Sequence, residues 1–268
     1  MKKNQTNRLS KQHKKSKGPK GIFGESAQQH DVSVKDVSVS AFETLRKKFP
    51  QLEFRYRDKL KKSEINKKLN DVDARLGVTI FVEKSEIKPD GGIIEVKDRE
   101  GKWRIVLVSE AKHQGKDIEN ISKGILVGKN KNQDTMVAGN AIERSHKNIN
   151  EIRNIMVDEK HFPYVLFLQG SNFLTESMTV KFPDGREVEL KYTDGSLNRI
   201  DRLTAANYSL PINQNSCKNI FITINGQTIM LQAVSIYTKA MPWTAEEMHK
   251  IMIDIAKSSL RIMKLIDE

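Results

Sequence analysis

Two runs of consecutive apolar residues constrain the fold of this chain more than any other feature. They are "IVLV" at residues 105–108 and "YVLFL" at residues 164–168, and such runs are typical of strands buried on both faces. Longer segments with apolar residues at helical spacing, such as residues 136–157 and 244–266, alternate with the strands. This alternation predicts an α/β fold with a mixed central β-sheet flanked by helices.

Turn residues divide the rest of the chain into hairpins and further helices. Hairpins are expected around "DREGK" at residues 98–102, around "PDG" at residues 183–185 and around "NG" at residues 225–226. A strand is expected over residues 78–83. Further helices are expected over residues 39–49, 63–77, 117–128 and 196–208. Ser63 is the expected N-cap of the second of these and Gly77 its end, and Thr244 is the expected N-cap of the last helix.

The charge of the chain is strongly basic and unevenly distributed. The net charge is +12 with a pI near 9.6, which indicates a polyanionic partner, nucleic acid before membrane. Residues 1–20 hold eight Lys or Arg and no acid. This arm is either a solvated tail or a segment that lies along phosphates and releases counterions. We expect a flexible basic arm over residues 1–20 and a single folded domain over residues 21–268.

The sequence carries no sign of a membrane or secretory address. No continuous apolar run approaches the roughly 18 residues that a membrane span needs. The basic N-terminus is not followed by an apolar core, so a secretory signal is not expected. Cys217 is the single cysteine and has no internal disulfide partner. These features predict a protein of the reducing cytoplasm.

The first apolar run ends in a carboxylate and an ammonium. Side chains alternate along a strand, so Glu110 and Lys112 share a face at the rim of the sheet. Asp90 starts the neighbouring hairpin strand, beside two glycines that permit close approach of another segment. Two adjacent carboxylates repel unless a cation bridges them, and oxygen ligation suits Mg²⁺. The three residues therefore predict a phosphodiester hydrolase in which Lys112 orients the attacking water or neutralises charge on the phosphate.

A simpler interpretation is open for the same residues. Glu110 and Lys112 could be a rim ion pair and Asp90 an ordinary turn residue. A second Glu-x-Lys tripeptide, from Glu95 to Lys97, lies close behind Asp90. We favour Glu110, because Glu95 is too near in sequence to face Asp90 across a hairpin.

The predicted helix over residues 136–157 has a polar, basic face. Asn140, Arg144 and Asn148 recur every four residues, with Lys147 beside them. Asn pairs well with adenine and Arg with guanine, so this face could read DNA bases, or it could be an ordinary solvated face. The opposite stripe of isoleucines packs either on its own sheet or across a dimer axis.

Several long segments of the chain carry specific sequence motifs. "PDGG", then a strand, then "EAKHQGKD" matches the PD-(D/E)xK nuclease pattern. Four further segments resemble the EcoRI restriction endonuclease family: "FRYRDKLKKSEINKKL", "AGNAIERSHKNINEI", "HFPYVLFLQGSNFLTE" and "LNRIDRLTAANY". This resemblance implies a restriction-endonuclease-like fold with DNA-embracing arms, one of which could be the hairpin of residues 176–193. That hairpin could equally be a plain extension of the sheet.

The resemblance also implies an activity and its partners. It implies a type II enzyme that acts as a homodimer on double-stranded DNA, cuts the palindrome GAATTC between G and A, and leaves 5′ overhangs with 5′-phosphates. It implies Mg²⁺ as cofactor, bound by Asp90, Glu110 and the main-chain carbonyl of Ala111. A cognate adenine methyltransferase would act on the same site.

Roles in DNA binding follow from the same resemblance. The residues implied in base recognition are Met136, Val137, Ala138, Gly139, Asn140, Ala141, Glu143, Arg144, Arg199 and Arg202. The expected phosphate contacts are Lys88, Lys116, Lys147 and Asn148. Val137 departs from the family pattern, in which alanine stands here, so its extra methyl groups could shift a contact with thymine.

Two other functions remain open at the level of sequence. One is a structure-selective or repair nuclease with the same catalytic pattern, which would cut many duplexes or junctions. The other is a DNA-binding protein that does not cut, which would need a disabled metal site.

Overall fold

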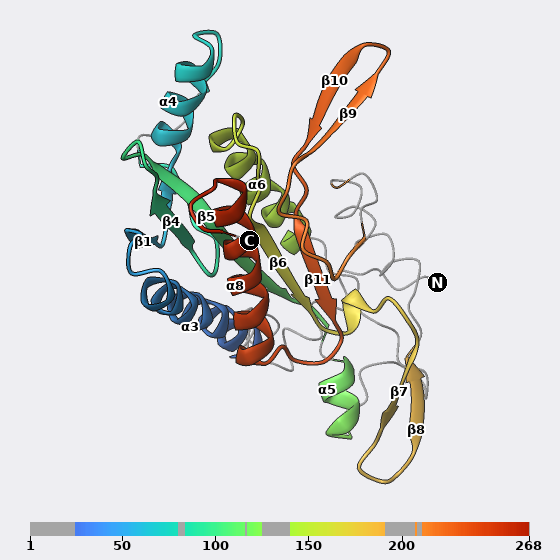
Figure 1. The fold of residues 1–268 in the computed structure, drawn as a ribbon. Helices are drawn as coiled ribbons and strands as arrows, with labels where there is room; N and C mark the ends of the chain where they lie inside the picture. Colours follow the sequence, from blue (N-terminus) through green and yellow to red (C-terminus); the bar gives the residue numbers. More distant parts are fainter. Residues whose placement is uncertain are drawn as a thin grey trace.

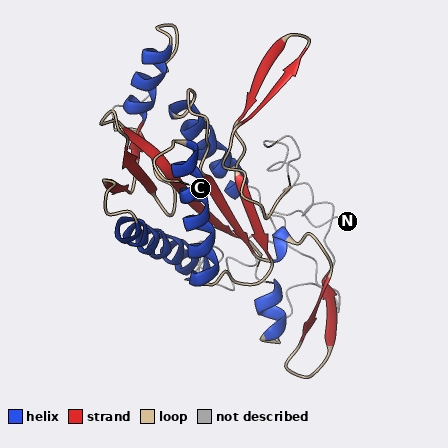
Figure 2. Ribbon diagram, viewed as in Figure 1, coloured by secondary structure: helices blue, strands red, loops and turns tan. Residues whose placement is uncertain are grey.

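The central sheet combines antiparallel and parallel strands. A computed structural model describes residues 25–79, 84–115, 117–124, 140–190, 207 and 211–267, with side chains for all of these except residues 25–33, 117 and 140–143. Five of the described strands form the sheet in the order β1 (Phe54–Arg57), β4 (Ile93–Lys97), β5 (Trp103–His113), β6 (Tyr164–Gln169) and β11 (Ser235–Lys239) (Figures 1 and 2). The β1–β4 and β4–β5 pairs are antiparallel, and the β5–β6 and β6–β11 pairs are parallel. The predicted mixed α/β sheet is therefore confirmed.

Helices cover both faces of this sheet. On one face α3 (Glu25–Lys48) and α8 (Ala245–Ile262) pack on Val165 and Phe167 of β6. On the other face α4 (Lys62–Val72) and α6 (Asn140–Ile155) pack on Leu166 and Leu168. Consecutive residues of β6 thus enter two different cores, which explains why this strand is apolar throughout.

The isoleucine stripe of α6 packs on its own sheet. Ile149, Ile152 and Met156 are buried in the core that contains Leu166. The side chain of Ile142 lies outside the described residues.

The last helix has the predicted cap. Thr244 Oγ1 accepts a hydrogen bond from the backbone N–H of Glu247 at 3.2 Å, and Glu247 Oε2 accepts one from the backbone of Thr244 at 2.9 Å. Hydrogen bonds from Lys239 and from Thr244 lower the pKa of Glu247 to about 2.

A bulge in β5 decides which face its charged residues occupy. Ile94 pairs with Leu107, but Glu95 pairs with Ile105, so β5 contains one extra residue between the two pairs. As a result Ile105 and Val108, three apart, lie on the α6 face. From Val108 onward the alternation carries Glu110 to that same face.

Two hairpins project from the body. β7 (Met178–Lys181) pairs with β8 (Glu187–Leu190), and this hairpin packs through Val180 on Ile121 of α5 (Asp117–Ser122). β9 (Ile220–Ile224) pairs with β10 (Gln227–Leu231) and turns at Asn225 and Gly226, both with positive φ. Both hairpins are confirmed. A shorter pair, β2 (Leu60–Lys61) with β3 (Glu86–Ile87), lies beside α4, and the 3₁₀ turn η1 (Ser171–Phe173) follows β6.

The predicted limits of α4 were wrong. Its N-cap is Lys61, whose backbone N–H donates to Glu64 Oε1 at 3.1 Å, so Ser63 lies inside the helix. The helix ends at Val72, and Gly77 lies beyond it with φ +72°. A Cβ at Gly77 would lie 2.1 Å from the carbonyl oxygen of Asn66, so glycine is required by close packing rather than by the helix end.

Several expected elements are shorter than predicted or lie outside the described residues. Of the strand predicted over residues 78–83, residues 78–79 are not in a strand and residues 80–83 lie outside the described part of the chain. Parts of three predicted helices also lie outside it: residues 125–128, residues 136–139 and most of residues 196–208. In the part of the chain that the structure describes, no helix has the length and apolar character needed to cross a membrane.

Candidate active site

Asp90, Glu110 and Lys112 lie together at the end of β5. Lys112 Nζ is 2.5 Å from Asp90 Oδ2 and 2.8 Å from Glu110 Oε1. The side chain of Glu110 is fully buried, whereas those of Lys112 and Asp90 are 15% and 21% exposed. Both carboxylates are therefore within reach of one cation, and the site opens to solvent on the side of Asp90.

Close packing of a glycine holds Asp90 in place. Gly91, next to Asp90, donates its backbone N–H to the carbonyl of Ser109 on β5 at 2.9 Å. A Cβ at Gly91 would lie 2.2 Å from Ser109 Oγ and 2.6 Å from Ser38 Oγ of α3. Tyr56 of β1 donates its hydroxyl to the carbonyl of Gly91 at 3.0 Å, and burial raises the pKa of Tyr56 to about 12, so it stays a donor. The expectation that glycine permits close approach here is confirmed.

Glu110 has further hydrogen-bond donors from two other elements. Ser145 and Asn148 of α6 donate to Glu110 at 3.3 and 3.2 Å, and the hydroxyl of Tyr164 on β6 donates to Glu110 Oε2. Together with Lys112, these donors satisfy a carboxylate that would otherwise be costly to bury.

The charges of the site act on its lysine and its tyrosine. Burial alone would lower the pKa of Lys112, but the nearby charges of Glu110 and Asp90 outweigh it and raise the pKa. Burial, with the charge of Glu110, raises the pKa of Tyr164 well above its usual value. Lys112 is therefore an ammonium and Tyr164 a neutral donor.

The chemistry of the donors fits a hard divalent cation. Asp90 and Glu110 both contact the Lys112 ammonium, so their carboxylates lie close together. Both potential ligands are carboxylate oxygens, which hard divalent ions prefer. Across the described residues, no group of three or more His, Cys, Asp or Glu side chains forms a metal site, so a cation here would rely on two carboxylates with backbone or water oxygens.

The second Glu-x-Lys tripeptide has a different role. Glu95 is 5% exposed and contacts Arg55 Nε at 2.5 Å and Arg57 Nη1 at 3.6 Å. The guanidinium of Arg55 also lies over the ring of Trp103, at 4.2 Å from its centroid. Glu95 thus belongs to an ion-pair cluster on β1 and β4.

The structure describes only part of the predicted DNA-binding set. Lys88, Arg144 and Lys147 are exposed, and Asn148 is half-buried against Glu110. Ala111 is buried in β5. Asn140, Ala141 and Glu143 belong to α6, but their side chains are not described. The residues outside the described part of the chain are Lys116, Met136, Val137, Ala138, Gly139, Arg199 and Arg202.

Sequence reasoning missed Tyr164 and Ser145 as partners of Glu110. A signal existed for Tyr164, because a tyrosine inside an apolar strand needs a partner for its hydroxyl. For Ser145, the only signal was its position three residues before Asn148 on one helical face. His113, the residue after Lys112, is buried: its side chain is 4% exposed, and its Nε2 lies 3.8 Å from Oε1 of Glu119 in α5.

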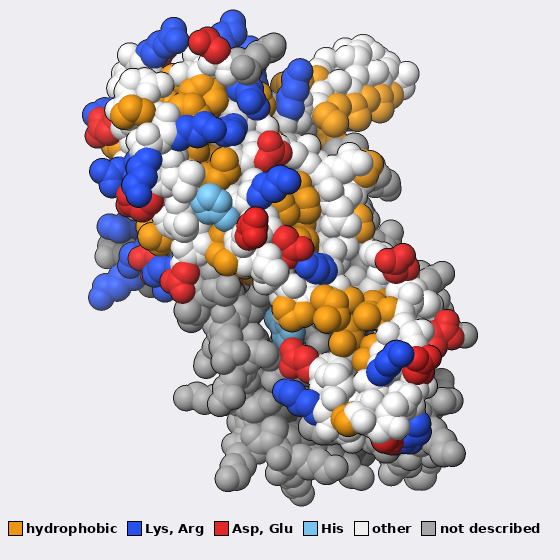
Figure 3. All heavy atoms as spheres, turned by 60° about the horizontal axis from the view of Figure 1, so that its bottom comes forward, with side chains coloured by type: hydrophobic (Ala, Val, Ile, Leu, Met, Phe, Trp, Pro, Cys, Tyr) orange, Lys and Arg blue, Asp and Glu red, His pale blue; other side chains and the backbone are white. Residues whose placement is uncertain are grey.

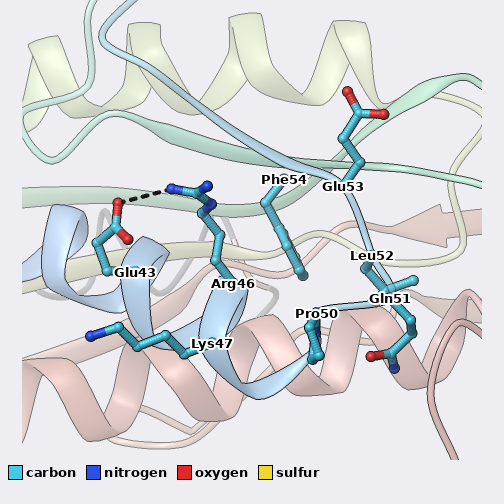
Figure 4. A pocket seen from close by; sticks show the side chains of 8 residues that line it. All are labelled: Glu43, Arg46, Lys47, Pro50, Gln51, Leu52, Glu53 and Phe54. Carbon is cyan, nitrogen blue, oxygen red and sulfur yellow. Dashed lines mark hydrogen bonds and ion pairs between the residues drawn. The ribbon is translucent and has the colours of Figure 1, made fainter.

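A hollow elsewhere on the surface has no comparable chemistry. It lies between the C-terminal end of α3 and the start of β1, and Figure 4 shows Glu43 and Arg46 paired with each other along it. Arg46 Nη1 is 3.4 Å from Glu43 Oε1, so the two charges compensate one another. Of these two places, the end of β5 has the charged groups that catalysis needs.

Comparison with known proteins identifies the family of this chain. The sequence matches the family described as "Restriction endonuclease EcoRI" over residues 16–267. It is 59% identical to the type II restriction enzyme EcoRI of Escherichia coli over 263 residues, which cover 97% of this chain and 95% of that protein. It is 54% identical to the type II restriction enzyme RsrI of Cereibacter sphaeroides over 261 residues, which cover 97% and 94%. A divalent metal cofactor and action on double-stranded DNA are implied for such enzymes. The chain belongs to the EcoRI family of type II restriction endonucleases.

Proposed function

We propose that this enzyme hydrolyses both strands of the palindrome GAATTC between G and A, as a homodimer that uses Mg²⁺. The products carry 5′ overhangs with 5′-phosphates. The observation that supports this best is the contact of Lys112 Nζ with both Asp90 and Glu110. It brings together two carboxylates that would hold the metal and a lysine that would face the phosphate, as metal-dependent phosphodiester hydrolysis needs. The recognition sequence itself rests on similarity to the family.

The three side chains divide the chemistry among them. Asp90 and Glu110 would hold Mg²⁺, which when bound polarises a phosphoryl oxygen and lowers the pKa of a ligated water. Lys112, an ammonium between the carboxylates, would neutralise charge on the phosphate and orient the attacking water. The enclosed position of Glu110 keeps bulk water from its carboxylate.

The direction of the β5 backbone supports Ala111 as a third ligand. Ser109 exchanges backbone hydrogen bonds with Gly91 and Gly92 at 2.9 and 3.2 Å. Backbone groups two residues apart in a strand point to the same side. The carbonyl of Ala111 therefore points to the side of β5 on which the Asp90 turn lies.

We assign the DNA-binding roles by similarity, and the described residues fit them. Arg144 and Lys147 are exposed on α6, whose residue Asn148 contacts the site, so bases and the scissile phosphate could be engaged from one helix. Base recognition would further involve residues 136–141, Glu143, Arg199 and Arg202. Phosphate contacts would come from Lys88, Lys116 and Lys147.

The β9–β10 hairpin is the surface that we assign to the second copy. Its sequence "IFITINGQTIML" has no charged residue, in a chain of which 30% is charged. Phe221, Ile224 and Ile229 are 56%, 53% and 45% exposed, and Figure 3 shows apolar side chains along the projecting hairpin. A palindrome is matched by a two-fold dimer in which both copies offer the same patch. Copies with net charge +12 approach each other most easily through an uncharged surface.

The base of this hairpin is fixed to the end of the α6 segment. Asn219 Nδ2 donates to the carbonyl of Glu159 and Gln232 Nε2 to that of Met156, both at 2.7 Å. A dimer contact through the hairpin would therefore hold the two α6 helices in a defined relation.

Two further parts complete the proposal. The β7–β8 hairpin, within residues 176–193, would be an outer arm that embraces the duplex, and the basic arm of residues 1–20 would lie along phosphates. The enzyme would act in the cytoplasm, where an adenine methyltransferase modifies the same site in host DNA.

Digestion of a plasmid of known sequence tests this proposal. We expect discrete fragments with 5′-AATT ends in the presence of Mg²⁺ and none without it. Glu110→Ala and Asp90→Ala should abolish cleavage while duplex binding persists. Glu95→Gln is the matched control, from the other Glu-x-Lys tripeptide, and should still cleave.

Each alternative function predicts a different digest. Full cleavage by Glu110→Ala would refute the site. Fragments without a shared end sequence would indicate a structure-selective nuclease. Binding without cleavage by the wild type would indicate a DNA-binding protein.

A further inference from the structure

Glu110 is held by donors that do not belong to the PD-(D/E)xK pattern. Its side chain has no exposed surface, so its charge depends on partners within the fold. Oε1 contacts Lys112 at 2.8 Å and Ser145 at 3.3 Å. Oε2 accepts hydrogen bonds from Asn148 at 3.2 Å and from Tyr164. Oε1 is therefore the oxygen turned toward Lys112 and Asp90, and Oε2 is the oxygen that the fold retains.

Tyr164 is a rigid anchor for this oxygen. In the parallel register of β5 and β6, Glu110 pairs with Leu166, so Tyr164 lies two residues earlier on the same face. Its ring is fully buried and stacks on Phe162, with centroids 5.9 Å apart and planes 19° apart. A side chain packed in this way has one position for its hydroxyl, which here is directed to Glu110.

Asn148, the second donor to Glu110 Oε2, lies on α6, the helix expected to recognise DNA bases. Ser145 and Asn148 are three residues apart on α6 and so share a face. Arg144 and Lys147, one residue before each of them, are exposed. One side of α6 thus contacts the carboxylate while the adjacent side remains available to a ligand.

We propose that Tyr164 and Asn148 are positioning residues that fix Glu110 Oε2, so that Oε1 is presented to the divalent metal. The inference rests on the proposed function, since it assumes that Glu110 is a metal ligand. It changes the role of Asn148, because the side chain acts through Glu110 and not through a phosphate. It also means that one helix, α6, carries both the face expected to contact DNA and a side chain that positions the metal-binding carboxylate.

Two variants with matched controls test the inference. Tyr164→Phe and Asn148→Ala each remove one donor to Oε2. Tyr237→Phe alters a half-buried tyrosine of β11, and Asn150→Ala alters an exposed asparagine of α6. Three quantities are measured for each protein: duplex affinity in EDTA, the Mg²⁺ concentration at half-maximal cleavage, and the rise in melting temperature with Mg²⁺ in the absence of DNA.

The inference predicts a selective loss of metal affinity. Tyr164→Phe and Asn148→Ala should raise the half-saturating Mg²⁺ concentration about 10–100-fold, in cleavage and in thermal stabilisation alike. Duplex affinity in EDTA should be unchanged, and both controls should match the wild type. Lower duplex affinity for Asn148→Ala in EDTA, with an unchanged Mg²⁺ requirement, would make it a phosphate contact and overturn the inference.

The design separates this inference from the proposed function. If the wild type does not cleave DNA, the proposed function fails. The rise in melting temperature with Mg²⁺ can then still be compared between the variants and the wild type, and this comparison tests the positioning role. If the wild type cleaves and both variants need no more Mg²⁺ than it does, only the positioning role fails. Should Tyr164→Phe not fold, Asn148→Ala alone decides, because its side chain is half-buried on a helix surface.

Discussion

Gly91→Ala should disrupt the site through packing alone. Gly91 does not have a positive φ, so the new methyl group causes no backbone strain of its own. It would lie 2.2 Å from Ser109 Oγ and 2.6 Å from Ser38 Oγ, about 1 Å inside ordinary contact. These hydroxyls are 2.6 Å apart and bonded to each other, and Ser38 also donates to the carbonyl of Val34 at 2.8 Å. Neither can turn away without breaking a buried hydrogen bond.

The size of the effect follows from these contacts. Overpacking costs about 1–3 kcal/mol, and one broken buried hydrogen bond adds about 1 kcal/mol. We therefore expect Gly91→Ala to lower the free energy of unfolding by about 2–4 kcal/mol in urea denaturation. Because Asp90 is the adjacent residue, the Mg²⁺ concentration for half-maximal cleavage should rise as well.

A double-mutant cycle isolates the packing term. In a Ser38→Ala, Ser109→Ala background both hydroxyls are absent, and the nearest remaining atom is Ser109 Cβ at 3.0 Å. There Gly91→Ala should cost less than about 1.5 kcal/mol. Gly101→Ala is the control, because its Cβ would meet no atom within 4 Å and its φ is +78°. Its cost of about 1–2 kcal/mol should be equal in both backgrounds. An equal cost of Gly91→Ala in the two backgrounds would refute the packing argument.

Three further predictions concern the last helix, DNA binding and the dimer. Glu247→Gln should lower stability by about 1 kcal/mol at neutral pH. Because the pKa of Glu247 is depressed, its contribution to the free energy of unfolding is complete above about pH 4.5 and is lost as the pH falls toward about 2. In acid denaturation, the variant should therefore lose less stability than the wild type between these pH values. Lys147→Ala should weaken binding to all duplexes and reduce the slope of log affinity against log salt concentration by about 0.9. Asn140→Ala should cost about 1–3 kcal/mol of discrimination at one base pair. Equal, uniform losses of affinity in both variants would contradict the separate roles of phosphate contact and base recognition. Phe221→Asp should shift sedimentation from dimer to monomer, and Val78→Asp, at a 79% exposed site off the hairpin, should not.

Patterns in the sequence predicted the elements whose causes are local. The capping box at Thr244 and the turn at Asn225 and Gly226 depend on residues that are neighbours in the chain. The start of α4 is also local, but Ser63 was the wrong choice. Glu64 accepts the backbone N–H of Lys61, and this bond starts the helix before Ser63. A polar residue near a helix start is thus a weaker guide than the acceptor three residues beyond the true cap.

The face of Glu110 could not be predicted from the apolar run of β5. Val106, Leu107 and Val108 are all buried, so their hydrophobicity does not reveal which of them point to α6. The bulge opposite Ile94 and Glu95 adds one residue, and without it Glu110 would lie on the opposite face, toward α3. That Glu110 and Lys112 share a face was predictable from their spacing, but which face they share was not.

The site therefore depends on two strand registers that no local pattern encodes. The antiparallel bond between Gly91 and Ser109 places Asp90 beside Lys112, and the parallel pair of Glu110 with Leu166 places Tyr164 beside Glu110. A slip of one residue in either register would move one carboxylate, or its anchor, to the wrong face of the sheet. The glycine, which admits no side chain, and the buried tyrosine, which needs a hydroxyl acceptor, each penalise such a slip. The same two residues that position the carboxylates thus also specify the strand pairing on which the site is built.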